Sequence, residues 1–310
     1  MLKKLKNTDL NIFPIILGSD YYGSTVSEQT AFDNIDLYIK NGGNLIDTAR
    51  MYVNGKSEET IGKYIAKRGL KNKLLISTKA AYPDGEKLEI HRLTREELEA
   101  DTDKSLKALG VDVIDILWLH RDDTTVPVEQ VADAMDEIVK KGKIRYWGVS
   151  NWTAKRLEEL NNYAEQSGKA KIFGSQIQWS LARCFKCTDT TLVAMNNTEY
   201  EYYSKNDMPV FAYASQGKGF FEKYHSNTLS QKAKERYLCD ENIKTYELFK
   251  KVSLETGHSL TALGLAYLVK QSEVDTFSLI GCTKTEYVTK AMEALTVADN
   301  VMTDILKIKP

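Results

Sequence analysis

The chain has 310 residues, of which 42% are hydrophobic and 27% charged, and its formal net charge is −1. This composition is typical of a globular protein with a large core, and the near-zero charge excludes the strongly basic surface that a nucleic-acid partner would require. No apolar run is long enough to cross a membrane and residues 1–6 lack the apolar segment of a signal peptide, so the sequence predicts a cytoplasmic protein with free thiols.

Short apolar runs alternate with helical patterns along the chain. The first pattern is a β-hairpin over residues 2–12. Buried strands are then predicted over residues 13–18, 44–46, 73–79, 113–120, 144–150, 172–178, 209–214 and 276–281. These runs are mainly apolar, as is typical of parallel strands that are covered on both faces.

Helix-capping residues stand before several of the intervening segments. Ser27 and Thr153 each precede a helical pattern, and Thr94 with Glu97 forms a capping box. Further helices are predicted over residues 128–141, up to residue 206, on both sides of Gly257, and over 285–295. Residues 217–240 are polar and have no clear period, so the sequence predicts a loop there.

Eight strands that alternate with helices are the pattern of a (β/α)8 TIM barrel with an N-terminal hairpin. We expect one barrel domain over residues 1–310, with its active site at the carboxyl ends of the strands. The alternative is a doubly wound open sheet, which normally has a glycine-rich G-x-G-x-x-G turn after an early strand. That motif is absent from the sequence.

Polar residues at these strand ends predict a site for proton transfer. Asp47, Lys79 and His120 end predicted strands, and Tyr52 follows the first of them. The ordinary pKa of tyrosine is about 10, and we expect the ammonium of Lys79 to lower it. With Asp47 holding the lysine and His120 orienting a carbonyl oxygen, Tyr52 becomes a proton donor for carbonyl reduction.

The sequence resembles the aldo-keto reductase family over nearly its whole length. The resemblance rests on residues 43–52, 57–62, 77–79, 119–120, 142–152, 176 and 279–284. It implies that Asp47, Tyr52, Lys79 and His120 form a catalytic tetrad in an NADPH-dependent reductase of small carbonyl compounds. It also implies a monomer or a weak homo-oligomer.

The resemblance further implies a binding site for NADP(H). Ser150, Asn151 and Gln176 would hold the carboxamide of the nicotinamide, and Trp179 would stack on its ring. The remaining cofactor contacts would be Gly18, Ser19, Tyr213, Ala214, Ser215, Gln216, Lys218, Gly281, Thr283, Lys284, Glu286 and Tyr287. Among these, Thr283 and Lys284 resemble the family's contacts to the 2′-phosphate, and Glu286 resembles an adenine contact.

Several side chains near the predicted barrel mouth are candidates for substrate binding. The aromatic candidates are Tyr21, Tyr22, Tyr82, Trp152 and Phe185, which could pack on a sugar or an aromatic ketone or serve only in loop packing. Arg121 could bind a polar group of the substrate or form an ion pair with Asp122 or Asp123.

Two other functions remain open from the sequence. The potassium-channel β-subunits that this family includes suggest a barrel that binds the cofactor and a protein partner. A metal-dependent hydrolase is the second alternative, but of four histidines only His120 lies at a strand end. Cys184 and Cys187 match a redox or zinc pair without a second such pair, so we predict no metal site.

Overall fold

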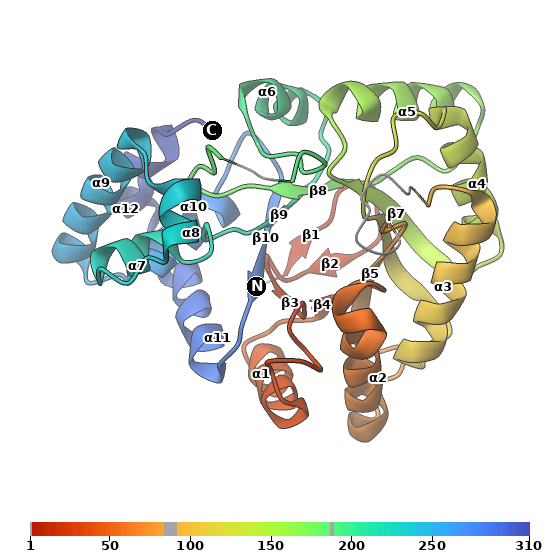
Figure 1. The fold of residues 1–310 in the computed structure, drawn as a ribbon, viewed down its shortest axis with the longest axis horizontal. Helices are drawn as coiled ribbons and strands as arrows, with labels where there is room; N and C mark the ends of the chain where they lie inside the picture. The colour runs from red at the N-terminus through yellow and green to blue at the C-terminus, as the bar shows by residue number, and fades with distance from the viewer. Residues whose placement is uncertain (1, 84–91, 187–188) are drawn as a thin grey trace.

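The computed structural model describes residues 2–83, 92–186 and 189–310 and contains a closed barrel of eight parallel strands. The strands lie in the order β10-β3-β4-β5-β6-β7-β8-β9 around the barrel. Their bounds are β3 (Ile15–Gly18), β4 (Leu45–Asp47), β5 (Leu75–Ala80), β6 (Ile114–Leu119), β7 (Ile144–Ser150), β8 (Ser175–Gln178), β9 (Val210–Tyr213) and β10 (Thr276–Gly281). The predicted (β/α)8 barrel is therefore confirmed, and Figure 1 shows its helices surrounding the strands.

A hairpin of β1 (Lys3–Lys4) and β2 (Asn11–Ile12) covers the amino-terminal ends of the barrel strands. Lys3 pairs with Asp275, the residue before β10, at 2.5 Å. Apolar side chains of the hairpin, Leu5 among them, pack in one cluster with barrel residues such as Trp118. Because this end is filled, the carboxyl ends of the strands are left for a site.

The helices outside the strands begin where the capping residues predict. The helices before β9 are α1 (Glu28–Lys40), α2 (Lys56–Arg68), α3 (Arg95–Leu109), α4 (Val128–Lys140), α5 (Ala154–Gln166) and α6 (Asn197–Lys205). The side chains of Ser27 and Thr153 accept hydrogen bonds from the first turns of α1 and α5. Thr94 and Glu97 form the predicted capping box of α3.

The prediction of a loop over residues 217–240 is wrong, because this segment contains α7 (Phe220–His225) and α8 (Gln231–Tyr237). Isolated helices of this length are unstable in water and depend on tertiary contacts. Here Phe221 packs against Phe249 of α9 (Asp240–Thr256), with 4.8 Å between ring centroids. The two short helices lie beside α9 at the left of Figure 1.

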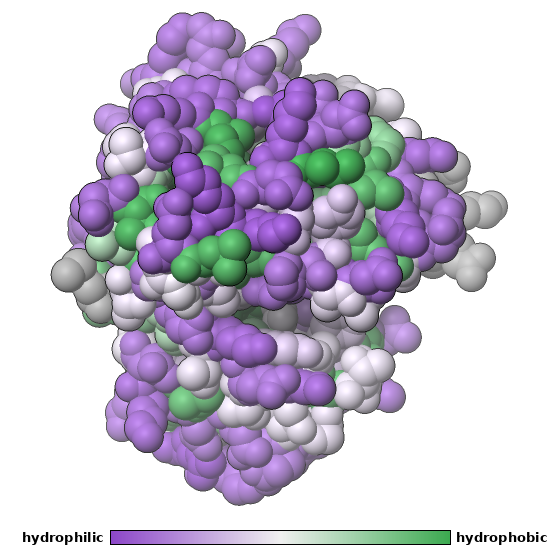
Figure 2. Space-filling model, turned by 90° about the vertical axis from the view of Figure 1, so that its left-hand side faces the viewer, coloured by the Kyte–Doolittle hydropathy of each residue, from purple (hydrophilic) through white to green (hydrophobic). Residues whose placement is uncertain are grey.

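The last part of the chain is also helical. It contains α10 (Leu260–Val269), α11 (Thr285–Met292), α12 (Asp299–Met302) and the short 3-10 helices η2 (Glu293–Thr296) and η3 (Ile305–Lys307). Figure 2 shows the side of the molecule that these C-terminal helices occupy in Figure 1. The surface there is mostly hydrophilic, and its apolar side chains form small separate patches.

Gly62 allows α2 to pack closely on α3, and this contact provides a stability test. A Cβ atom at Gly62 would lie 2.2 Å from the carbonyl oxygen of Ala108. We expect Gly62→Ala to lower the free energy of unfolding by about 1–3 kcal/mol, because backbone must move to admit the methyl group. Gly264 in α10 is the matched control, since its nearest neighbour, Phe249, would be 3.7 Å away.

Denaturant unfolding of both variants measures this difference. Gly264→Ala gains helix propensity and should be neutral or more stable than wild type by up to ~1 kcal/mol. If both alanine variants unfold at the same denaturant concentration, the close approach at Gly62 does not restrict the side chain.

Candidate active site

The carboxyl ends of the barrel strands line a cavity of about 980 Å³. It contains most of the residues that the sequence predicts for a site. Those that line it are Gly18, Ser19, Tyr21, Asp47, Tyr52, Tyr82, His120, Arg121, Ser150, Asn151, Gln176, Tyr213, Ala214, Ser215, Gln216, Lys218, Gly281, Thr283 and Tyr287. Parallel strands place their carboxyl ends at one rim, which explains why residues so far apart in the chain meet here.

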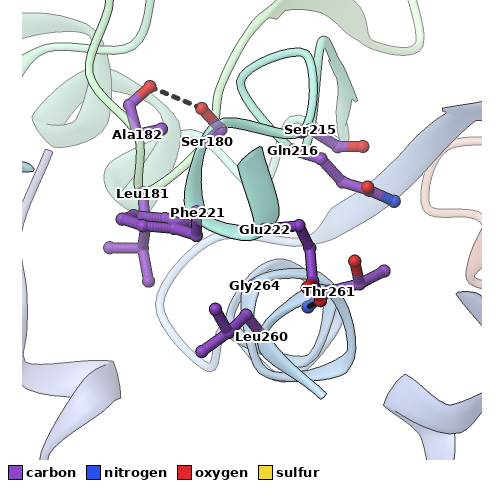
Figure 3. A pocket seen from close by; sticks show the side chains of 11 residues that line it. Ser180, Leu181, Ala182, Ser215, Gln216, Phe221, Glu222, Leu260, Thr261 and Gly264 are labelled. Atoms are coloured by element: carbon purple, nitrogen blue, oxygen red, sulfur yellow. Dashed lines mark hydrogen bonds between the residues drawn. The ribbon is translucent and has the colours of Figure 1, made fainter. Parts of the chain in front are cut away.

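A second and much smaller cavity lies beside the large one (Figure 3). Its volume is about 10 Å³, room for about one water molecule. Figure 3 shows Ser180 at its wall, where the hydroxyl donates to the carbonyl oxygen of Ala182 at 2.7 Å. Glu222 accepts a hydrogen bond from the backbone N–H of Thr261 at 3.0 Å. This small cavity cannot hold a substrate, so the candidate site is the large cavity.

A buried ion pair of Asp47 and Lys79 supports the wall of the large cavity. Adjacent strands β4 and β5 bring the two residues together. The Lys79 ammonium donates to the Asp47 carboxylate and, at 2.7 Å, to the carbonyl oxygen of Thr48. Asp47 also accepts from Ser77 at 2.6 Å and from Gln176 at 3.2 Å. Burial alone would lower the pKa of Lys79, but attraction to Asp47 and Tyr52 raises it, so the lysine remains charged.

Tyr52 lies next to this pair, at the start of the 3-10 helix η1 (Tyr52–Gly55) that follows β4. The Lys79 ammonium lies 4.9 Å from the centre of the Tyr52 ring. Burial raises the pKa of Tyr52, and the opposing effect of Lys79 does not reverse that rise. The prediction of a lowered pKa is therefore wrong, because desolvation outweighs the charge of the lysine. Tyr52 keeps its proton at neutral pH.

His120 follows β6 and faces Tyr52, with 5.9 Å between the two ring centroids. Its side chain is buried, and burial together with the charges of Lys79 and Arg121 holds its pKa well below the usual value. The imidazole is therefore neutral at pH 7. Within the described residues its Nδ1 atom has no hydrogen-bond partner. A neutral ring of this kind can donate one hydrogen bond and accept another.

Asn151 is the centre of a hydrogen-bond network in the wall of the cavity. Its Oδ1 atom accepts from the hydroxyl of Tyr213 at 2.6 Å and from the N–H of Val193 at 3.2 Å. Its Nδ2 atom donates to Ser150 at 3.0 Å and to the carbonyl oxygen of His120 at 3.3 Å. These four bonds use the full capacity of the amide, so a ligand at Asn151 must displace one of them.

Trp179 does not line the cavity, which corrects its predicted position. Side chains alternate along a strand, so Gln176 and Gln178 face the cavity, and Trp179 lies on the other side. Its ring packs edge-on against Tyr200 and Tyr267, at centroid distances of 5.9 and 6.1 Å. The aromatic residue at a strand end that does line the cavity is Tyr213, at the end of β9.

Three of the predicted substrate-binding aromatic residues also lie elsewhere. Tyr22 and Trp152 are buried in the core and do not line the cavity. The Trp152 indole is covered by the guanidinium of Arg156, 4.9 Å from the ring. Phe185 is 55% exposed and lies outside the cavity lining. The sequence does not reveal whether an aromatic side chain in a loop faces the cavity, the core or the solvent.

The ion pair predicted for Arg121 has a different partner. Its guanidinium lies 3.5 Å from the carboxylate of Asp189, whereas Asp122 pairs with Arg156. A carboxylate that the sequence analysis missed, Asp20, also lines the cavity directly after β3. Burial raises the pKa of Asp20. Its place two residues after a predicted strand was the available signal.

Several cationic side chains line the cavity. In addition to Lys218, they are Lys223, Arg236 and Lys290, which the sequence analysis missed. Lys223 and Arg236 belong to α7 and α8, which were predicted as loop, and Lys290 lies within α11. Lys284 and Glu286 are not part of the lining; they form a weak, exposed pair with 3.9 Å between their charged atoms.

The described residues contain no cluster of three or more histidine, cysteine, aspartate or glutamate side chains that could hold a metal ion. Cys184 is a free thiol, and its sequence partner Cys187 lies outside the described residues. In the described part of the chain, every helix is too short or too polar to cross a membrane.

Comparisons with known proteins agree with this geometry. A model of the aldo/keto reductase family matches residues 14–309. The "Putative aryl-alcohol dehydrogenase AAD14" of Saccharomyces cerevisiae is 30% identical, over 94% of this chain and 81% of its own length. "Aldo-keto reductase ausK" of Emericella nidulans is 28% identical, over 93% of this chain and 75% of its own length. The "Putative voltage-gated potassium channel subunit beta" of Schizosaccharomyces pombe is 25% identical, over 86% of this chain and 79% of its own length.

Proposed function

Since this chain belongs to the aldo/keto reductase family, we propose that it reduces aldehydes or ketones to alcohols with NADPH, using Tyr52 as the proton donor. Family membership makes the protein an oxidoreductase. The observation that carries the finer proposal is the arrangement of Tyr52 over the buried Asp47–Lys79 pair, with neutral His120 opposite. We propose that residues 1–310 form one catalytic barrel domain.

The side chains have separate tasks in this proposal. The bound nicotinamide would supply the hydride for the carbonyl carbon. Tyr52 donates its proton to the carbonyl oxygen, and the raised pKa of this residue ensures that the proton is present at neutral pH. His120 donates a hydrogen bond to the same oxygen and orients it. Lys79 stabilises the negative charge that develops on Tyr52, and Asp47 holds the lysine in position.

The residues of the cavity suit a large anionic cofactor. The volume of about 980 Å³ lies in the range of small-molecule and cofactor sites. Lys218, Lys223, Arg236 and Lys290 provide positive charge for phosphate groups. We propose that Gln176, Ser150 and Asn151 bind the carboxamide of the nicotinamide. Asn151 must first release one of its present hydrogen-bond partners. Tyr213 replaces Trp179 as the proposed aromatic contact of the nicotinamide ring.

Purified protein, NADPH and a set of aldehydes, ketoses and aromatic ketones test the proposal, with oxidation of the nicotinamide followed by absorbance. Tyr21 and Tyr82 line the cavity, and one relative bears the name of an aryl-alcohol dehydrogenase. We therefore expect aromatic aldehydes among the substrates. If none of these compounds causes the protein to oxidise NADPH, the proposal is wrong.

The choice of NADPH over NADH depends on groups that meet the 2′-phosphate, and the structure adds Lys290 to the predicted Lys284. Both side chains are exposed, but Lys290 lines the cavity, whereas Lys284 lies outside the lining and near Glu286. We expect Lys290→Met to weaken NADPH binding roughly ten- to a hundredfold and to change NADH binding little. Lys284→Met should have a smaller effect because Lys284 lies outside the cavity lining and its charge is partly balanced by Glu286.

Fluorescence titration of both cofactors against wild type and both variants measures these affinities. If the wild type binds NADH and NADPH with equal affinity, neither lysine contacts the 2′-phosphate. If Lys284→Met loses more NADPH affinity than Lys290→Met, Lys284 is the main contact of the phosphate.

A second candidate function is supported by the relative that is named as a potassium-channel subunit. In that case the barrel would bind the cofactor and regulate a protein partner, with little turnover of its own. The aldehyde assay separates the two functions. Turnover of aromatic aldehydes that depends on Tyr52 supports the enzyme, and tight cofactor binding without turnover supports the partner subunit.

A further inference from the structure

Arg121 lies beside the proposed proton-transfer residues in an arrangement that holds its guanidinium in a fixed position. It follows His120 directly, is 8% exposed, and lines the cavity. Its Nε atom donates to the hydroxyl of Thr191 at 3.0 Å, and Nη1 donates to the carbonyl oxygen of His120 at 2.9 Å. The guanidinium carbon lies 5.2 Å from the centre of the Tyr82 ring. A planar group held on several sides is prepared to bind a ligand without losing much side-chain entropy.

The present partners leave part of this guanidinium for a ligand. Arginine has five N–H donors. Within the described residues, the contacts of Arg121 use one N–H on each of its three nitrogen atoms. The contact with the Asp189 carboxylate is 3.5 Å long, which is beyond the usual hydrogen-bond distance. The other oxygen of Asp189 is held by Thr191, at 2.9 Å from its N–H and 2.5 Å from its hydroxyl.

We propose that Arg121 binds a carboxylate group of the substrate, so that the site prefers aldehydes and ketones that carry a carboxylate. The proposal rests on the carbonyl reduction proposed above and names a substrate class for it. A guanidinium matches a carboxylate through two parallel hydrogen bonds. Since Arg121 adjoins His120, a substrate whose carbonyl oxygen meets Tyr52 and His120 can place its carboxylate against the arginine.

The other carboxylates of the cavity are placed so that they oppose this binding little. Asp47 is neutralised by its ion pair with Lys79. Asp20 follows β3, which is separated from β6 by two strands in the barrel order. Glu222 belongs to α7 and accepts a hydrogen bond from the backbone N–H of Thr261. Asp189 is the carboxylate that competes directly for Arg121. Its long contact with the arginine shows that the protein satisfies the guanidinium only in part.

Pairs of substrates that differ only in the carboxylate provide the test. We compare benzaldehyde with its 2-, 3- and 4-carboxy derivatives and take the ratio of kcat/KM for each carboxylated aldehyde to that for benzaldehyde. For at least one isomer, Arg121→Met should lower this ratio roughly ten- to a hundredfold. The ratio for Arg121→Lys should lie between those of wild type and Arg121→Met, because an ammonium keeps the charge but not the planar arrangement of N–H donors.

Asp189→Asn is the matched variant with the opposite expectation. Asparagine keeps an oxygen acceptor for Thr191 but removes the charge that competes with the substrate. The ratio for the same isomer should therefore increase. Because each ratio is internal to one protein sample, it does not depend on the fraction of folded enzyme.

The outcomes separate this inference from the proposed function. If wild type reduces benzaldehyde and Arg121→Met leaves the ratio unchanged for all three isomers, the carboxylate preference is wrong while the reductase remains. An unchanged or lower ratio in Asp189→Asn overturns the role of Asp189 as competitor and with it the proposed contact. Failure of wild type to reduce any of the aldehydes overturns the proposed function itself.

Discussion

Replacing Tyr52 by phenylalanine is expected to reduce the rate of carbonyl reduction by about 100- to 10,000-fold, the usual contribution of general acid catalysis. The change removes only the hydroxyl, and the ring remains beside Lys79 and His120. Affinity for NADPH should stay close to that of wild type. Steady-state kinetics and cofactor titration on the same preparations measure the two quantities.

Tyr146→Phe is the control for loss of a tyrosine hydroxyl. The Tyr146 hydroxyl contacts Asp9 of the hairpin segment, at the closed end of the barrel, at 2.9 Å. This variant should reduce carbonyl compounds at nearly the wild-type rate. If Tyr52→Phe behaves in the same way, Tyr52 is not the proton donor.

Replacing Lys79 by methionine is expected to lower both activity and stability. The buried carboxylate of Asp47 would lose its ion-pair partner, and loss of one partner of a buried pair usually costs about 3–5 kcal/mol. The developing charge on Tyr52 would also lose its stabilising cation, so kcat should fall and the pKa of Tyr52 should rise further. Denaturant unfolding and the pH profile of kcat measure these effects.

The stability effect of Lys79 has a defined pH dependence. The pKa of Lys79 is raised in the folded protein, so its contribution is fully present below the unfolded value of about 10.4. This contribution is lost as the pH rises through the higher folded value. The difference in stability between wild type and Lys79→Met should therefore be constant near neutral pH and should decrease in strongly alkaline solution.

Lys63→Met is the control for a lysine in an exposed ion pair. Lys63 lies 2.9 Å from Glu28, and both side chains are more than half exposed. Exposed pairs contribute about 0–1 kcal/mol, so this variant should keep its stability and activity. A Lys79→Met protein as stable and active as this control would show that Lys79 neither holds Asp47 nor assists Tyr52.

Local patterns in the sequence are sufficient to predict the barrel and the residues at its strand ends. The eight apolar runs predict parallel strands because both faces of such strands are covered. Ser27, Thr94 and Thr153 mark helix starts because their side chains satisfy free N–H groups of the first turn. Asp47 and His120 lie at the cavity because all strand ends of a barrel meet at one rim. These are local signals, and local sequence is sufficient to read them.

The direction in which side chains face and the pairing of charges depend on the folded arrangement of the chain. Residues 217–240 form α7 and α8 only because Phe221 and its neighbours bury against α9. Trp179 packs in the core against Tyr200 and Tyr267, whereas Tyr213 lines the cavity. Arg121 meets Asp189, which is 68 residues away in the chain. The pKa of Tyr52 rises because burial outweighs a single nearby charge. Each of these outcomes depends on distances between segments remote in sequence, and such distances exist only once the chain has folded.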